Sequence, residues 1–143
     1  MNGRPWIPLV ALVSSTLACG ARPRQDVAFF KYAPDTVELR GTLVFEKRFG
    51  PPGYGEDTLK DLRLNVPFLR LDFPIEVLGD STNPLAGDTH QGVDRVQLTA
   101  VPAGTALHEM ANQALVVRGN LKEAVWGRQY TQVVIEVISV EKP

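Results

Sequence analysis

Residues 36–47 read TVELRGTLVFEK, with apolar side chains at nearly every second position. This alternation places one set of residues on a single face of an extended chain, at Val37, Leu39, Gly41, Leu43 and Phe45. A period of two predicts a strand with one face buried in a core. Glycine in the middle of a strand weakens it, so Gly41 indicates a bulge or a sharp coil in the chain.

Similar alternation recurs along the chain and predicts four more strands, at residues 67–78, 93–101, 114–122 and 130–140. In the first of these, Phe73 falls on the inward face. Pro74 indicates a sheet edge or a bulge, because proline has no N–H to donate. A short helix is expected within residues 102–113, where apolar residues recur at helical spacing and Thr105 can cap the first turn.

The expected order is three strands, a short helix and two strands. The fourth strand repeats a pattern of the first, because V-x-G-x-L at residues 117–121 matches L-x-G-x-L at residues 39–43. This layout predicts a mainly β domain, a small five-stranded OB-like barrel with one short helix between the third and fourth strands. An open β-sandwich is the alternative, since it gives the same alternation but has no need of the helix.

The start of the chain predicts an export signal that ends at a lipidated cysteine. Arg4 precedes an apolar run of about a dozen residues, which is too short to cross a bilayer roughly 30 Å thick. The run ends in STLACG at residues 15–20, which resembles the lipobox of bacterial lipoproteins. Cys19 is the only cysteine, and acylation would remove a free thiol that exported proteins avoid. Plain secretion with an incidental Cys19 is the alternative.

This start divides the chain into a signal peptide at residues 1–18, a lipidated tether at residues 19–35 and the OB-like domain at residues 36–143. A short ordered piece at residues 27–30 can form within the tether. Lipid on Cys19 anchors a folded body to a membrane without spanning it. The expected location is therefore the cell envelope, on the periplasmic or outer-membrane face.

Charge and motifs argue against several functional classes. The formal net charge is −1 and no long basic run occurs, whereas a nucleic-acid binder needs positive charge to release phosphate counterions. The sequence has no G-x-S-x-G motif and no Gly-rich phosphate loop leading into a helix. We therefore expect no enzymatic activity, no cofactor and no nucleic-acid partner.

Aromatic residues next to an arginine give the best candidates for binding. Tyr54 lies in a Gly/Pro-rich loop that can present its ring, and Trp126, Arg128 and Tyr130 cluster in the turn before the last strand. Aromatic and arginine side chains dominate the energetics of many interfaces. Gln97, on the polar face of the third strand, is a further candidate. In the alternative interpretation Trp126 and Tyr130 cap one end of the barrel, and Arg128 is solvated.

Three residues of the loop at residues 79–92 are weak candidates for a cation site. Asp80, Asp88 and His90 can converge there, but they lack a recognised metal-ligand spacing. Such residues are more typical of a solvated loop, so the sequence predicts no metal site.

Five short motifs occur in order along the domain: VELRGTL (37–43), GPPGYG (50–55), LRLDFPI (69–75), VDRVQL (93–98) and VVRGNL (116–121). Together they resemble a bacterial family of small exported domains of unknown function, over about residues 37–140. The resemblance implies an OB-like fold but no established activity. That family often has a histidine-rich stretch before its last strand, whereas the matching residues 127–131 here are GRQYT, so no histidine-dependent metal role is implied.

The sequence thus predicts a membrane-anchored lipoprotein of the bacterial envelope. Its domain is expected to be a non-enzymatic module that binds an envelope protein or a small ligand. One alternative is a small envelope hydrolase or metal-binding domain that uses the loop at residues 79–92. Another alternative is an OB-type nucleic-acid binder, for which fold analogy is the only argument.

Overall fold

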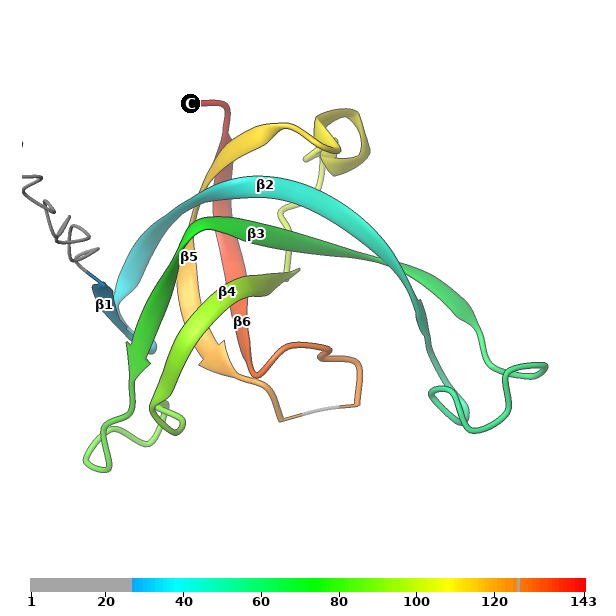
Figure 1. Ribbon diagram of the computed structural model, residues 1–143, viewed down its shortest axis with the longest axis horizontal. Helices are drawn as coiled ribbons and strands as arrows, with labels where there is room; N and C mark the ends of the chain where they lie inside the picture. Colours follow the sequence, from blue (N-terminus) through cyan, green and yellow to red (C-terminus); the bar gives the residue numbers. More distant parts are fainter. Residues whose placement is uncertain (1–26, 126) are drawn as a thin grey trace, which may run out of the picture.

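The computed structural model describes residues 27–125 and 127–143, and this part of the chain is mainly β (Figure 1). The strands are β1 (Ala28–Lys31), β2 (Thr36–Phe49), β3 (Arg63–Leu78), β4 (His90–Thr99), β5 (Ala114–Glu123) and β6 (Val133–Glu141). One turn of 3-10 helix, η1 (Leu107–Met110), lies between β4 and β5. The predicted signal peptide and Cys19 lie outside the described residues. Within those residues, no helix is long and apolar enough to span a membrane.

The strands form one sheet in the order β1-β3-β2-β5-β6-β4, and β4 also pairs with β3. The pairings of β2 to β6 therefore return to their starting strand, and the sheet is ring-like (Figure 1). Within this ring, β4 and β6 run parallel, and the other paired strands are antiparallel. The short strand β1 is added outside the ring and runs parallel to β3.

Two glycines lie where strands approach one another most closely. Gly41 pairs with both Leu71 of β3 and Leu115 of β5, so β2 changes neighbours at this residue. A Cβ atom on Gly41 would lie 2.1 Å from the carbonyl oxygen of Arg70, and one on Gly119 would lie 2.2 Å from that of Glu136. Both distances are shorter than any van der Waals contact, so these positions require glycine.

The core fills the inside of the ring with apolar side chains from all of its strands. Its most enclosed members include Leu43, Leu69, Val77, Val96, Val117, Leu121, Val133 and Ile135. The inward positions predicted for residues 36–43 are confirmed, because Val37, Leu39 and Leu43 are all buried. Burial of this apolar surface supplies the main favourable free energy of folding.

The strand count differs from the predicted five, because β1 forms within the residues assigned to the tether. Tyr32, which follows β1, is only 1% exposed and donates a hydrogen bond of 2.8 Å to the carbonyl oxygen of Asp88. The predicted tether at residues 19–35 therefore overlaps the folded domain. An isolated four-residue run has no detectable period, so the sequence could not distinguish this edge strand from a linker.

The predicted helix is also shorter than expected. Only η1 forms; it follows Ala106 and has no side-chain cap, so Thr105 does not cap it. Gly104 has a φ of 88°, a left-handed conformation that interrupts a helix. The ring of His108 stacks on Phe45 with 4.4 Å between centroids, which fastens this turn to β2.

Phe73 does not face the core; its side chain is 66% exposed. The register between β3 and β4 shifts between Arg70 and Ile75, and Pro74 lies in this irregular stretch. The irregularity is local, because Ile75 and Val77 beyond it are again buried in the core. The bulge or irregularity that Pro74 predicted is confirmed, and the inward position predicted for Phe73, which lies within it, is wrong.

Candidate functional site

A buried aromatic ring lies on the outer face of the sheet, away from the core. Phe68 is directly paired with Val44 of β2 and Gln97 of β4, and its neighbour Leu69 faces the core. Alternation therefore points Phe68 outward, yet its side chain is 0% exposed. Two arginines cover it: the guanidinium carbons of Arg48 and Arg95 lie 5.6 Å and 5.4 Å from the ring centroid.

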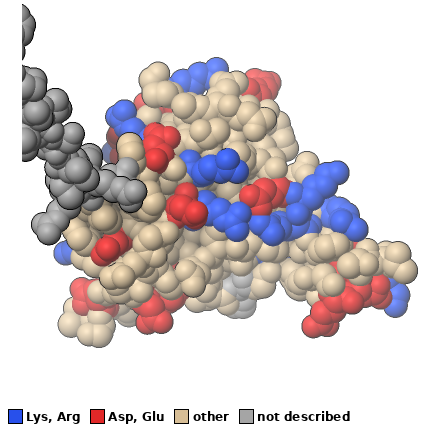
Figure 2. Space-filling view, viewed as in Figure 1, with Lys and Arg blue, Asp and Glu red and all other residues tan. Residues whose placement is uncertain are grey.

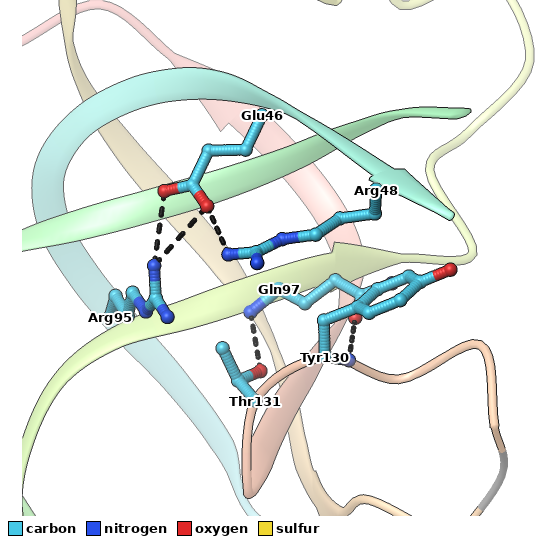
Figure 3. A network of polar contacts seen from close by, with 6 residues as sticks. All are labelled: Glu46, Arg48, Arg95, Gln97, Tyr130 and Thr131. Carbon is cyan, nitrogen blue, oxygen red and sulfur yellow. Dashed lines mark hydrogen bonds and ion pairs between the residues drawn. The ribbon is translucent and has the colours of Figure 1, made fainter. Parts of the chain in front are cut away.

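These arginines share one carboxylate. Arg95 Nη1 donates to Glu46 Oε1 at 3.0 Å, and Arg48 Nη2 donates to Glu46 Oε2. Figure 3 shows the Glu46 carboxylate between the two guanidinium groups. We call Glu46, Arg48 and Arg95 the arginine network. It has one positive charge in excess and lies over an aromatic surface, an arrangement that suits an anionic or planar group.

Gln97 connects β4 to the chain that precedes β6. Its Nε2 donates to the carbonyl oxygen of Arg128 at 3.0 Å, and its Oε1 accepts from the N–H of Tyr130 at 2.7 Å. Its own backbone N–H donates to Thr131 Oγ1 at 3.1 Å. Gln97 is only 7% exposed, and its side chain holds this segment in place; its role as a ligand contact stays a prediction.

Tyr130 joins this segment to the end of β2. Its hydroxyl donates to the carbonyl oxygen of Phe49 at 2.6 Å, and the guanidinium carbon of Arg48 lies 6.0 Å from its ring centroid. Burial, followed by the nearby Tyr54 hydroxyl, raises the pKa of Tyr130 against the opposing effect of Arg128 and Arg48. Tyr130 therefore stays a neutral donor at physiological pH.

The Gly/Pro-rich loop between β2 and β3 is organised by one carboxylate. Asp61, 6% exposed, accepts hydrogen bonds of 2.6 Å from the N–H groups of both Gly53 and Gly55. Burial alone would raise the pKa of Asp61, but the backbone donors of Gly55, Gly53 and Asp57 lower it below its ordinary value. An ionised Asp61 thus fixes the loop at neutral pH.

This fixed loop presents Tyr54. The residue has a φ of 53°, and its ring is 42% exposed. A Cβ atom on Gly127 would lie 3.6 Å from Tyr54 Cζ, so the ring packs against the segment before β6. Tyr54, Gln97, Arg128 and Tyr130, predicted from separate stretches of sequence, are therefore brought together. The fifth candidate, Trp126, lies outside the described residues.

A hollow of about 240 Å³ adjoins these residues. Its lining includes Arg95 and Asp94 from β4 and Tyr130 and Thr131 from the segment before β6. Figure 2 shows Lys and Arg side chains gathered in a band across one side of the molecule, interrupted by acidic groups. We call the arginine network, the hollow, Tyr54 and Tyr130 the outer-face site.

The weak cation candidates lie elsewhere, around the loop before β4. Asp80 accepts hydrogen bonds from the N–H and hydroxyl of Thr82, and His90 Nε2 lies 3.3 Å from Glu123 Oε1. Asp80 and Asp88 line a second hollow of about 400 Å³ together with Glu123. Within the described ranges, no group of three or more His, Cys, Asp or Glu side chains is placed to hold a metal ion.

Four residues of this site were not predicted from the sequence: Glu46, Arg48, Phe68 and Arg95. A signal was present, since Phe68 shares the face of β3 that also carries Arg70, which is exposed. A large apolar residue on a charged face indicates a local cover. Which residues supply that cover depends on the pairing of three strands, which the pattern along one strand does not contain.

No protein-family profile, curated protein or solved structure gave a significant match to this chain. The resemblance to a family of exported domains therefore stays a proposal.

Proposed function

We propose that this chain is a lipid-anchored module of the bacterial envelope that binds an envelope protein or a small ligand through the outer-face site. The observation that carries this proposal is the convergence of Tyr54 and Tyr130 beside Arg48 and Arg95. Arg128 lies in the same segment as Tyr130. The loops that carry these residues are fixed by Asp61 and Gln97. Aromatic and arginine side chains held in place before binding lose little entropy when a partner arrives.

We also infer that the ring is an OB-like barrel to which β1 is added. Support comes from the circuit of pairings through β2, β3, β4, β6 and β5, from the parallel pairing of β4 and β6, and from β2 changing neighbours at Gly41. A β-sandwich would have two separate sheets. Barrels of this type bind ligands on the middle strands and the two adjoining loops, which is where the outer-face site lies.

The anchor is proposed from the lipobox-like pattern before Cys19. It is tested by growing cells with a palmitate analogue and comparing the wild type with Cys19→Ser. Label on the wild type that disappears in the variant is expected. Unlabelled protein in the medium would instead make the chain a freely secreted module.

The binding role is tested with a photo-crosslinking amino acid placed at Tyr54. The control is the same amino acid at Ile138 on β6. Ile138 is 53% exposed and Tyr54 is 42% exposed, so both positions are accessible. Irradiation of intact envelopes is expected to give a discrete adduct from position 54 and none from position 138. Equal adducts from both positions, or none from position 54, would refute the outer-face site as the binding surface.

A further inference from the structure

The arginine network holds more positive charge than its single carboxylate, Glu46, neutralises. Arg70 of β3 is the direct cross-strand partner of Arg95, so the two side chains leave the same face of the sheet. Like charges directly opposite one another destabilise a pair of strands. Arg48 and Arg95 share the carboxylate of Glu46, and Asp94 lines the hollow beside Arg95. A bound anion would relieve this repulsion.

Arg48 has hydrogen-bonding capacity that the described residues do not use. Its Nε is buried without a hydrogen-bond partner among them. A buried donor left unpaired costs free energy, and more so in a charged group. The guanidinium is nevertheless held between the Phe68 and Tyr130 rings, at 5.6 Å and 6.0 Å. The donor group is thus fixed in place before any ligand arrives.

The network is accessible from solvent. The side chains of Glu46, Arg48 and Arg95 are 30%, 33% and 40% exposed, and Arg95 also lines the hollow of about 240 Å³. Glu46 bridges both guanidinium groups, so its carboxylate marks the position that another oxyanion would take. At 30% exposed, the Glu46 side chain also borders solvent.

We propose that the arginine network is a binding site for an oxyanion, a phosphate or carboxylate group of a small envelope ligand, which displaces Glu46. Arginine forks match the paired oxygens of both groups. In the free protein Glu46 occupies the site and competes with the ligand. This inference rests on the proposed binding function and names the class of ligand.

The test is an NMR titration of the full-length protein in neutral detergent, following the Nε–H signals of Arg48 and Arg95. The probes are inorganic phosphate and acetate, each compared with chloride at constant ionic strength. Saturable shifts with phosphate, acetate or both are expected, and the stronger of the two identifies the oxyanion. Equal, unsaturable shifts with chloride would overturn the proposal, since they show only counterion screening.

Because Glu46 competes with the anion, removing its charge should strengthen anion binding, which gives a second test. Glu46→Gln removes the internal competitor and is expected to lower the dissociation constant for the anion by roughly fivefold or more. The matched control is Glu38→Gln, which removes the carboxylate of an exposed pair with Arg40 at 3.3 Å and is expected to change nothing. Unchanged or weaker anion binding by folded Glu46→Gln protein would refute the displacement.

Should Glu46→Gln fail to fold, Arg70→Gln serves instead, because Arg70 is exposed and its loss removes a repulsion. It is expected to weaken anion binding several-fold, and unchanged binding would contradict the proposal.

The anion-binding inference and the proposed partner surface around Tyr54 can be refuted independently of each other. Adducts at position 54 without anion binding would refute only this inference, whereas anion binding without adducts would refute only the proposed partner surface.

Discussion

At Gly41 the absence of a single methyl group allows β2 to lie against both β3 and β5. We predict that Gly41→Ala lowers the free energy of unfolding by about 4 kcal/mol or more, because the new Cβ would lie 2.1 Å from the Arg70 carbonyl oxygen. Urea unfolding followed by circular dichroism measures the loss.

Gly104→Ala is the control for this substitution. Gly104 has a φ of 88° but nothing within 4 Å of a Cβ atom, so the expected cost is only about 1 kcal/mol of backbone strain. Similar losses in the two variants would show that backbone strain, and not the close approach of the strands, makes glycine necessary at position 41.

Tyr32 predicts how stability changes in alkali. Burial, with the charges of Glu123 and Asp88, raises the pKa of Tyr32 from 10.0 to about 12. Below pH 10 neither state ionises this hydroxyl and its contribution is complete. As the pH rises from 10 toward 12 the unfolded chain ionises first, so the free energy of unfolding falls.

Tyr32→Phe removes this dependence and also the hydrogen bond to Asp88. We expect the variant to lose about 1 kcal/mol at pH 8 and to show a shallower decline than the wild type between pH 10 and 12. Urea unfolding across this range gives both values. Parallel declines in the two proteins would mean that Tyr32 ionises equally in the folded and unfolded states.

Among the elements, the β2–β3 hairpin is connected to the segment before β6 by the hydrogen bond from the Tyr130 hydroxyl, in addition to the packing of the Tyr54 ring. Tyr130→Phe removes the hydrogen bond to the Phe49 carbonyl but keeps the ring over Arg48. We predict faster cleavage by trypsin at Lys60 and Arg63, which flank the end of the hairpin loop, as that loop opens more often. Mass spectrometry of the early fragments identifies the cut.

Tyr54→Phe is the matched control, since no hydrogen bond from the Tyr54 hydroxyl occurs within the described part of the chain. Its rate of cleavage is expected to equal that of the wild type. Equal rates for Tyr130→Phe as well would show that the hydrogen bond from Tyr130 is not needed to keep the loop closed.

The elements that the sequence predicted best are strands with one buried face and a long run of alternating apolar and polar residues. Residues 36–47 needed only a two-residue extension to match β2. The predicted strand at residues 67–78 began late, because Arg63 to Val66 pair with β2 beyond the main core and show a weak apolar alternation. Element boundaries there are set by a strand partner rather than by local pattern.

At the scale of the whole molecule, the ring predicts a hierarchy of opening. Amides of β1 are expected to exchange with deuterium early, since among the described strands β1 pairs with β3 alone. Amides in β2 to β6 that pair within the ring should exchange late and together, because opening any pair breaks the circuit. Exchange of β4 well before β5 would contradict a closed ring.

The outer-face site was only partly predictable because it exists only in the assembled molecule. Tyr54 was predicted from one loop and Arg128 and Tyr130 as a cluster in another, and the structure brings the two loops together. The pairing of Glu46 with Arg95 links residues of β2 and β4 that are separated by the whole of β3. No spacing along the chain contains such a contact.

The attachment of β1 also has a mechanical consequence. The chain before Val27 continues directly into β1, whose four residues lie in parallel register with Ile75 to Leu78 of β3. A pull along the axis of β1 therefore shears this whole ladder at once, where a pull across it would unzip one pair at a time. Tyr32 and its hydrogen bond to Asp88 come next in line. A domain tethered from this end would carry tension into β3 and the core through this short shear joint.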